Sequence, residues 1–353
     1  MQTKRHSRRR FLRRAGRLSA LGLAAPYFVA SRVLAAPGQP GANDRVAIGV
    51  IGTGIRGKHL IASMPAQGRV VAICDSHLPR VADTLEPKGR YQGMLARFHE
   101  QDAEHCTGYQ DFRKLLDGEK LDAVMIATPD HNHILPAILA CQAGRDVYCE
   151  KALSLYVAEG RALVNAAKRY GRVVQVGSQN RSMAMNQLGC RLVREGRLGK
   201  VSLVQLPTYR GPMRYRGLPE EPIPKGLGWD LFCGPTELRP HNRKLWIKDE
   251  FRVDGRLWRG WDLWRSYSGH FMTNWGAHSV DMIQLALGTD GTGPVEIRPL
   301  VDGYQGEMRS CPVAARYAGG IELRFDLPAT DKWTFDGEQG KMLMRRNTFV
   351  TDP

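Results

Sequence analysis

Three glycines stand at a spacing that suits phosphate binding. Gly52, Gly54 and Gly57 form a Gly-x-Gly-x-x-Gly pattern directly after an apolar run at 46–51. The first glycine allows a tight turn, the second lets the backbone approach a pyrophosphate, and the third lets a helix pack closely on the strand. The amides at the start of that helix would face the phosphates. We therefore expect the whole loop to contact a dinucleotide: Gly52, Thr53, Gly54, Ile55, Arg56 and Gly57.

An acidic residue follows at the distance that such a site requires. Asp75 ends the next apolar run, 69–74, where its carboxylate would accept hydrogen bonds from the adenosine ribose hydroxyls. Its charge would repel a 2′-phosphate, which favours NAD(H) over NADP(H) as the cofactor. Arg80 offers a cation for a 2′-phosphate, although an exposed helix arginine is the simpler interpretation. The alternative for the unit as a whole is a Rossmann fold that binds another nucleotide or none.

Two further polar clusters follow the ends of later apolar runs. Thr128-Pro129-Asp130-His131-Asn132-His133 comes after 123–127, and Glu150-Lys151 comes after 146–149. In a parallel sheet these strand ends lie at the ligand-binding edge. The two histidines suggest a metal site, but no carboxylate-rich partner motif stands nearby, so we predict no metal. Lys151 is placed to hold a substrate hydroxyl and to accept or donate its proton. The residues expected to line the cofactor cleft are Thr128, Pro129, His131, His133, Glu150 and Lys151.

A third cluster opens a helical segment at 271–287. Asn274 and His278 are four residues apart and Asp281 is three further on, so a regular helix would place all three on one face. A histidine oriented by a carboxylate suits general-base work near neutral pH. These three residues and Lys151 are the predicted catalytic residues.

The elements that must hold these residues alternate between strand and helix. As far as Val176, continuous apolar runs linked by helical stretches indicate a parallel sheet covered on both faces. The later part combines helices, a loop-rich stretch at 207–270 and β-rich segments. We predict an α/β Rossmann domain over 45–178, plus an α+β domain with a predominantly antiparallel open sheet over 179–353.

Positive charge is concentrated at the amino terminus. The chain has a formal charge of +16, but residues 1–35 hold nine Lys and Arg and no acidic residue, so the remainder carries +7. Ser7-Arg8-Arg9-Arg10-Phe11-Leu12 is a twin-arginine pattern, and the uncharged stretch at 18–31 is too short to span a bilayer comfortably. We predict an export signal over 1–35, removed on maturation, and a linker at 36–44. The moderately basic body suits an anionic cofactor and gives little reason to expect nucleic acid.

This signal has consequences for location and partners. The twin-arginine translocase is the expected partner during export, and the expected location is the periplasm or another exported compartment, without stable membrane insertion after cleavage. A basic amphipathic anchor is the alternative interpretation of the segment. Because this route carries folded proteins, we expect the cofactor to be loaded before export and held tightly.

Together, the motifs resemble the glucose–fructose oxidoreductase / inositol dehydrogenase / rhizopine-catabolism (Gfo/Idh/MocA) family, and within it the exported twin-arginine branch. The glycine loop, Thr128-Pro129 with its histidine pair, Glu150-Lys151 and Gly276-Ala277-His278 fall in the family's order and spacing. The resemblance implies hydride transfer between nicotinamide and a hydroxyl-bearing carbon of a sugar-like small molecule. It implies His278 as the base and Lys151 as the catalytic lysine. We also expect a homo-oligomer.

Three departures from the family pattern matter. Position 152 is Ala where the family usually has Pro, which would restrict the preceding lysine, so we expect a less fixed aim for Lys151. Asn274 replaces the usual Asp, and an amide cannot stabilise an imidazolium by charge. Family members also generally continue further, so we expect the second domain to be incomplete.

The leading prediction is an NAD(H)-dependent oxidoreductase that acts on a sugar, cyclitol or glycoside. One alternative is a glycosidase that keeps NAD bound and cleaves by transient oxidation and elimination. Another is a non-catalytic cofactor-binding relative. Within 207–270, aromatic and basic side chains are candidates for sugar contacts, with packing under a long loop as the equal alternative: Trp229, Trp246, Trp258, Trp261, Trp264, Arg210, Arg239 and Arg259.

Overall fold

The computed structural model describes residue 41 and the ranges 44–246, 251–253, 256–258, 260–304, 309–328 and 330–352, with the backbone alone described over 251–258. The predicted export signal at 1–35 and most of the predicted linker at 36–44 lie outside these residues, as do Arg259 and the side chain of Trp258. Within the described part of the chain, no helix is long and apolar enough to cross a membrane.

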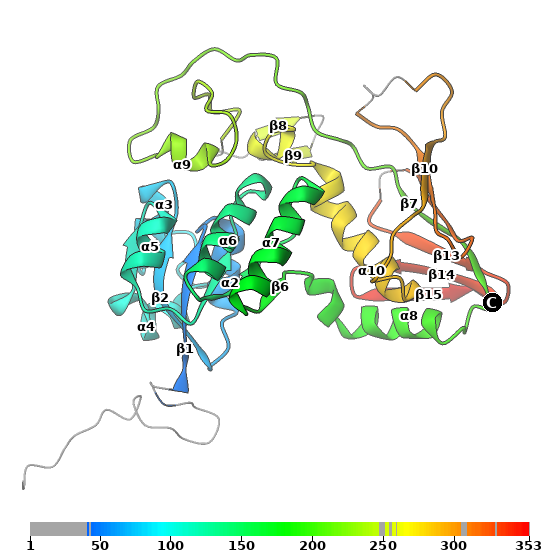
Figure 1. The fold of residues 1–353 in the computed structure, drawn as a ribbon, viewed down its shortest axis with the longest axis horizontal. Helices are drawn as coiled ribbons and strands as arrows, with labels where there is room; N and C mark the ends of the chain where they lie inside the picture. Colours follow the sequence, from blue (N-terminus) through cyan, green and yellow to red (C-terminus); the bar gives the residue numbers. More distant parts are fainter. Residues whose placement is uncertain are drawn as a thin grey trace, which may run out of the picture. The chain divides into compact units, whose positions relative to one another are not determined.

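Six parallel strands form the first sheet, in the order β3-β2-β1-β4-β5-β6. Figure 1 labels β1, β2 and β6 among the helices that surround this sheet. The chain leaves β1 toward one side and returns to its other side at β4, so a crevice opens where the carboxyl ends of these two strands meet. The parallel sheet predicted from the apolar runs is therefore confirmed. Its strands are β1 (Val46–Ile51), β2 (Gly68–Cys74), β3 (Thr107–Tyr109), β4 (Ala123–Ile126), β5 (Asp146–Cys149) and β6 (Val174–Val176).

Helices cover both faces of this sheet. Alternate strand residues divide between two apolar clusters: Ile51 and Cys74 pack with α5, α6 and α7, whereas Val50 and Ile73 pack with α2, α3 and α4. This double burial explains why the strands are apolar throughout rather than alternating. The helices are α2 (Ile55–Ala62), α3 (Leu78–Leu85), α4 (Ala96–Gln101), α5 (Phe112–Gly118), α6 (Ile134–Gln142) and α7 (Val157–Tyr170), with short turns η3 (Ala103–His105) and η4 (Asp130–Asn132).

The second sheet has seven strands in the order β10-β11-β12-β7-β13-β14-β15. All neighbours are antiparallel except β12 and β7. Two helices, α8 (Ala184–Arg194) and α10 (Ala277–Leu287), pack on it around Val204 and Phe335. This confirms the predicted second domain with a mainly antiparallel sheet. The strands are β7 (Val201–Pro207), β10 (Glu296–Pro299), β11 (Val313–Arg316), β12 (Glu322–Leu327), β13 (Trp333–Gly337), β14 (Gly340–Arg345) and β15 (Thr348–Asp352).

The stretch between β7 and α10, residues 208–271, is here called the aromatic segment. Its described residues have little regular structure, as predicted: α9 (Trp229–Cys233), the β8–β9 pair (Phe251–Val253 and Arg256–Trp258) and η6 (Gly260–Leu263). Trp229, Trp264 and Tyr267 nevertheless lie in a buried core of their own. The segment is hydrogen-bonded to the first sheet's edge, where the Gly228 amide donates to the Ser76 carbonyl oxygen.

The predicted helix at 271–287 differs in one respect. It begins as a π-helical turn, η7 (Met272–Gly276), and only then continues as α10. A π-helical turn interrupts regular α-helical spacing and often occurs at functional sites. The turn contains Asn274, so the spacing argument that grouped three predicted catalytic residues on one face does not hold from end to end.

Candidate functional site

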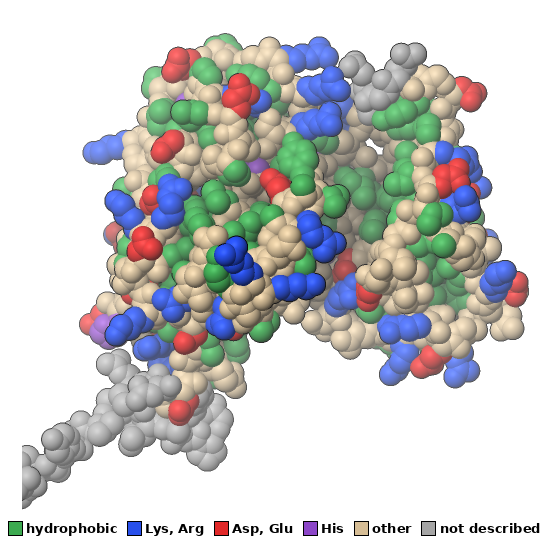
Figure 2. Space-filling view, in the orientation of Figure 1, with side chains coloured by type: hydrophobic (Ala, Val, Ile, Leu, Met, Phe, Trp, Pro, Cys, Tyr) green, Lys and Arg blue, Asp and Glu red, His purple; other side chains and the backbone are tan. Residues whose placement is uncertain are grey.

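A cavity of about 890 Å³ opens at the carboxyl ends of β1 and β4. Its size lies within the range of small-molecule and cofactor sites. Its lining runs from the glycine loop to Asn274 and His278, so one cavity joins the two ends of the predicted site. We call it the main cavity. On the face of the molecule seen in Figure 2, basic and acidic side chains are intermixed.

The three glycines of the loop meet three different constraints. Gly52 has φ +93°, and a Cβ there would lie 2.6 Å from the Ala127 carbonyl oxygen. A Cβ at Gly57 would lie 1.9 Å from the Gly52 carbonyl oxygen. At Gly54 a Cβ would meet no protein atom within 4 Å, so this position faces open space. Gly52 is thus needed for the turn and Gly57 for the close packing of helix on strand. The open space at Gly54 leaves room for a ligand to approach the backbone and fits a pyrophosphate.

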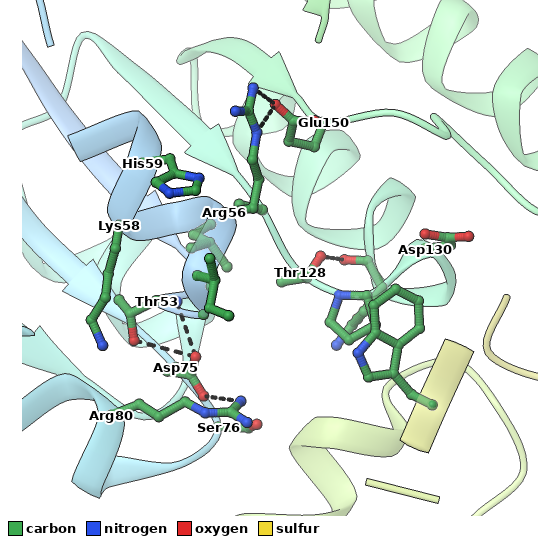
Figure 3. A pocket seen from close by; sticks show the side chains of 18 of the residues that line it. Thr53, Arg56, Lys58, His59, Asp75, Ser76, Arg80, Thr128, Asp130 and Glu150 are labelled. Carbon is green, nitrogen blue, oxygen red and sulfur yellow. Dashed lines mark hydrogen bonds and ion pairs between the residues drawn. The ribbon is translucent and has the colours of Figure 1, made fainter. Parts of the chain in front are cut away.

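Asp75 ties the loop to the second strand. Its Oδ2 accepts from the Thr53 amide at 2.9 Å (Figure 3). Its Oδ1 accepts from the His77 amide at 3.0 Å. Arg80 reaches to 3.8 Å from the same carboxylate and lies over the Trp246 ring, 5.3 Å from its centroid. Arg80 is therefore a half-buried part of the cavity wall, not the exposed helix residue that the sequence suggested.

The polar residues that follow β4 divide into two groups. Thr128 and Pro129 line the main cavity, as predicted. His131 does not: its ring is buried, and Nε2 donates to the Phe232 carbonyl oxygen at 2.8 Å. His133 is also away from the lining, with Nδ1 2.6 Å from the Ala152 carbonyl oxygen. The prediction that both histidines line the cofactor cleft is wrong, because backbone carbonyls hold their rings inside the protein.

Glu150 and Arg56 connect the end of β5 to the glycine loop. Arg56 Nε donates to Glu150 Oε1 at 2.8 Å, and the second guanidinium contact is 2.7 Å (Figure 3). Tyr148 donates to the same oxygen at 3.2 Å. Both ends of this pair line the main cavity. The pair positions the start of α2 against β5, which keeps the loop and Lys151 in a fixed relation.

Lys151 and Asn274 form the central contact of the opposite end. Lys151 Nζ donates to the main-chain oxygen of Asn274 at 2.9 Å and lies 3.2 Å from its side-chain oxygen. The Lys151–Ala152 peptide bond is cis. Burial lowers the pKa of Lys151, against the opposing charges of Asp130 and Glu150. The amine is therefore better placed than an ordinary lysine to exchange a proton near neutral pH.

His278 shares the cavity wall with this pair, but Asp281 does not. Burial, followed by the charges of Lys151 and Arg346, lowers the pKa of His278 to about 4, so its ring is neutral at physiological pH. Asp281 instead forms an ion pair with Arg181 at 2.7 Å and is absent from the cavity lining. The prediction of Asp281 as a catalytic carboxylate beside His278 is therefore corrected: an arginine on the turn η5 (Gln179–Ser182) holds it elsewhere.

Several cavity residues were missed by the sequence reasoning. Asp130 stood inside a motif that was noticed for its histidines. Trp275 likewise stood inside the motif that was noticed for Asn274 and His278. Asp262, Gln179 and Arg346 carry no local signal, since only the fold brings them to the cavity. All five residues line it.

The candidate sugar contacts in the aromatic segment also divide. Trp246 and Trp261 line the main cavity, whereas Trp229 stacks on Phe232 and Trp264 is buried in the segment's core. Arg239 pairs with Glu237 and Ser266, and Arg210 lines a separate cavity.

The fold and site define a two-domain oxidoreductase with a dinucleotide-binding Rossmann unit. Residues 46–178 match the family model described as "Oxidoreductase family, NAD-binding Rossmann fold", and residues 207–349 match "Oxidoreductase family, C-terminal alpha/beta domain". The chain belongs to the Gfo/Idh/MocA oxidoreductase family, and its predicted cofactor class, NAD, is that of the family.

Individual relatives and solved structures share 30% sequence identity or less with this chain in the three comparisons below. An inositol 2-dehydrogenase of Saccharopolyspora erythraea is 30% identical over 51% of this chain and 50% of its own length. An alpha-N-acetylgalactosaminidase of Tannerella forsythia is 29% identical over 56% of this chain and 43% of its own. The chain thus spans about half the length of these relatives. An inositol dehydrogenase homologue of Azotobacter vinelandii, solved with NADH and myo-inositol, superposes with TM-score 0.58 at 16% identity, over 89% of this chain and 75% of that one.

Proposed function

We propose that this protein is an NAD(H)-dependent oxidoreductase that transfers hydride to or from a hydroxyl-bearing carbon of a sugar, cyclitol or glycoside. One observation carries the proposal. The amine of Lys151, held by Asn274 and next to neutral His278, lies in the same cavity as the glycine loop. Bound NAD would supply the hydride acceptor or donor. The protein must then supply a group that handles the proton of the substrate hydroxyl.

Lys151 is the residue suited to that proton transfer. Its lowered pKa makes the neutral amine accessible, and Asn274 directs Nζ by two oxygen contacts. In the oxidation direction the neutral amine takes the hydroxyl proton as hydride leaves the carbon, and in reduction the ammonium returns it. His278, neutral and in the same wall, is able to orient the hydroxyl by a hydrogen bond. Asn274 acts by holding Lys151 rather than by exchanging a proton.

The substrate class follows from the rest of this end of the cavity. Trp261 and Trp275 offer flat apolar surface, while Gln179 and Arg346 offer donors. Aromatic faces with a few polar groups suit the apolar faces and hydroxyls of a sugar ring. Relatives named for inositol and for N-acetylgalactosamine support this class.

A glycosidase that retains NAD is the second candidate. Trp246, from the aromatic segment, is 1% exposed and closes the wall beside Arg80. A cofactor enclosed by this segment would leave slowly, which suits an exported protein and a redox-neutral cycle. Relatives named as an alpha-N-acetylgalactosaminidase and a glycosyl hydrolase family 109 protein favour it.

We also propose that the protein is exported to the periplasm through the twin-arginine translocase. The twin-arginine pattern at residues 7–12 supports this proposal.

The test is a substrate screen on the full chain supplied with NAD⁺. Aldoses, cyclitols and aryl glycosides are tested for nicotinamide reduction and for aryl release in parallel. We expect reduction with at least one polyol. Lys151→Met should lower the rate at least ~100-fold, the scale of general acid–base catalysis, whereas Lys168→Met, on the exposed face of α7, should not. Aryl release without net reduction supports the glycosidase instead. Neither signal, with NAD bound, contradicts both and supports a non-catalytic relative.

A further inference from the structure

A buried polar cluster lies at the Lys151 end of the main cavity. Asp130 and Asp262 are 8% and 6% exposed, and both line the cavity. Ser268 Oγ lies 3.0 Å from Asp130 Oδ2 and 3.0 Å from Asp262 Oδ1. Thr273 Oγ1 lies 2.7 Å from the same Asp130 oxygen. The cluster therefore joins the end of β4 to the aromatic segment and to the turn that holds Lys151.

The hydrogen-bond contacts of this cluster favour the presence of an additional proton. Each hydroxyl carries one proton and an ionised carboxylate carries none. The His270 amide donates to Ser268 Oγ at 2.9 Å, and the Gly269 amide donates to Thr273 Oγ1 at 3.1 Å, so both hydroxyl protons are left to point outward. The two hydroxyl oxygens also lie 3.3 Å apart, and Thr273 Oγ1 lies 3.2 Å from the His270 carbonyl oxygen, but their three contacts with carboxylate oxygens are shorter. Two hydroxyl protons cannot supply one linear hydrogen bond to each of those three contacts. One further proton, on either carboxyl group, fills all three.

The electrostatic surroundings agree with this count. Burial raises the pKa of Asp130 and Asp262 adds to the rise, against the influence of His133, Thr273 and Lys151. On the far side, His270 Nδ1 lies 2.9 Å from the Asp262 carbonyl oxygen and 3.8 Å from its carboxylate. Two buried carboxylates bridged by one hydroxyl are strongly disfavoured from being ionised together.

We propose that Asp130 and Asp262 share one proton through Ser268, and that this proton moves in response to the charge of Lys151. While Lys151 is neutral, the proton resides on Asp130. When Lys151 takes the substrate's hydroxyl proton, Asp130 passes its own proton to Ser268, which gives its hydroxyl proton to Asp262. The negative charge of the pair then lies on Asp130, the carboxyl group with the larger electrostatic influence on Lys151. Hydride leaves the substrate carbon for nicotinamide and no proton enters or leaves the relay.

The two carboxyl groups are positioning residues, since they act through Lys151. Their use in catalysis rests on the proposed function, whereas the shared proton does not. Among the charges that raise the pKa of Lys151, Asp130 has the largest influence and Asp262 a smaller one. Moving one negative charge between these two positions must therefore change the pKa of Lys151. A rise in this pKa indicates that the charge lies on Asp130, and a fall indicates that it lies on Asp262.

The first test is a ¹⁵N NMR titration of the Lys151 amine in the full chain, assigned by its loss in Lys151→Arg. Asp262→Asn confines the negative charge to Asp130, so we expect the pKa of Lys151 to rise. Asp130→Asn confines it to Asp262, so we expect the pKa to fall. If both carboxylates were ionised, each substitution would remove a negative charge and both would lower the pKa, which overturns the proposal. Asp117→Asn, on the exposed face of α5, should change nothing.

The second test needs no variant and therefore no folding control. Infrared spectroscopy of the wild-type chain at neutral pH should show the carbonyl stretch of a protonated carboxylic acid, shifted in D₂O. No such band at neutral pH overturns the shared proton. Neither test uses a substrate, so a failed substrate screen would leave this result standing, and a failed infrared test would leave the proposed function standing.

Discussion

Lys151 Nζ lies 2.9 Å from the main-chain oxygen of Asn274 and 3.2 Å from its side-chain oxygen. This contact joins the end of β5 to the π-helical turn before α10. It fixes the aim of Lys151, although Ala152 follows it in place of the proline expected from the family pattern. A backbone carbonyl oxygen has two lone pairs, so that of Asn274 can accept from Lys151 in addition to any amide of the helix.

Asn274→Asp should move the pH dependence of oxidation to higher pH. A carboxylate at the place of the Asn274 side-chain oxygen, 3.2 Å from Nζ, favours the ammonium and raises the pKa of Lys151, so the neutral amine appears only at higher pH. The measurement is the initial rate of nicotinamide reduction against pH. Asn274→Ala keeps the main-chain contact and should not shift the rising limb upward. A downward shift with Asp would show that Lys151 is not the group that titrates.

Gly54→Val and Gly52→Ala should fail in different ways. At Gly54 no protein atom lies within 4 Å of a Cβ, so valine should leave the melting temperature within a few degrees of wild type but weaken NAD binding at least tenfold. At Gly52, φ +93° and the Ala127 carbonyl oxygen oppose any Cβ, so alanine should destabilise the fold by at least ~2 kcal/mol. Thermal unfolding and calorimetric titration with NAD⁺ measure both. Equal loss of stability in the two variants would argue against a ligand space over Gly54.

Asp281→Asn should preserve activity. The carboxylate forms a partly exposed ion pair with Arg181 and does not line the main cavity. We expect kcat within about twofold of wild type and a stability loss of ~1 kcal/mol or less, the range of partly exposed ion pairs. Steady-state kinetics on the substrate found in the screen, with urea unfolding, checks this. A kcat loss like that of Lys151→Met would restore Asp281 to the site.

The folded protein should lose stability between about pH 6.5 and pH 4. Burial lowers the pKa of His131 and of His278 from 6.5 to about 4, so in this window the unfolded chain binds more protons than the folded one. Stability contributed by keeping these rings neutral is present above pH 6.5 and falls as pH falls. For His131, fully enclosed, the loss is of the order of 3 kcal/mol at 1.36 kcal/mol per pH unit.

Urea unfolding at several pH values measures this slope. His131→Gln keeps a donor for the Phe232 carbonyl oxygen. It should reduce the pH slope of the unfolding free energy by the contribution of about one bound proton. His105→Gln, at an exposed histidine, should leave it unchanged. A slope independent of pH between 4 and 6.5 would contradict the buried neutral rings.

The sequence was sufficient for the parts of the site that depend on neighbouring residues. The glycine loop, Asp75, Lys151 and the mainly antiparallel second domain were all predicted, because turn chemistry and apolar periodicity are local. His131 was misassigned because its partner, the Phe232 carbonyl oxygen, is about a hundred residues away in the sequence. His133 was misassigned because its ring nitrogens contact the carbonyl oxygens of Ala152 and Thr128, which its place in the motif did not indicate.

The same limit explains the errors in the catalytic end. Helical spacing alone placed Asp281 beside His278, but Arg181, a hundred residues upstream, holds it away. Asp262 and Ser268 belong to no motif, and the relation of these two residues and of Thr273 to Asp130 exists only through tertiary contact. A pattern within one helix therefore cannot show which side chains share a cavity.

The central claim is that the main cavity holds NAD(H). The most direct measurement is to purify the full chain, denature it, and identify and quantify the released nucleotide, with Gly54→Val treated in parallel. We expect NAD⁺ or NADH from the wild type, close to one per chain, and far less from the variant. No nucleotide from the wild type, together with no binding of added NAD⁺ or NADH, would contradict the account.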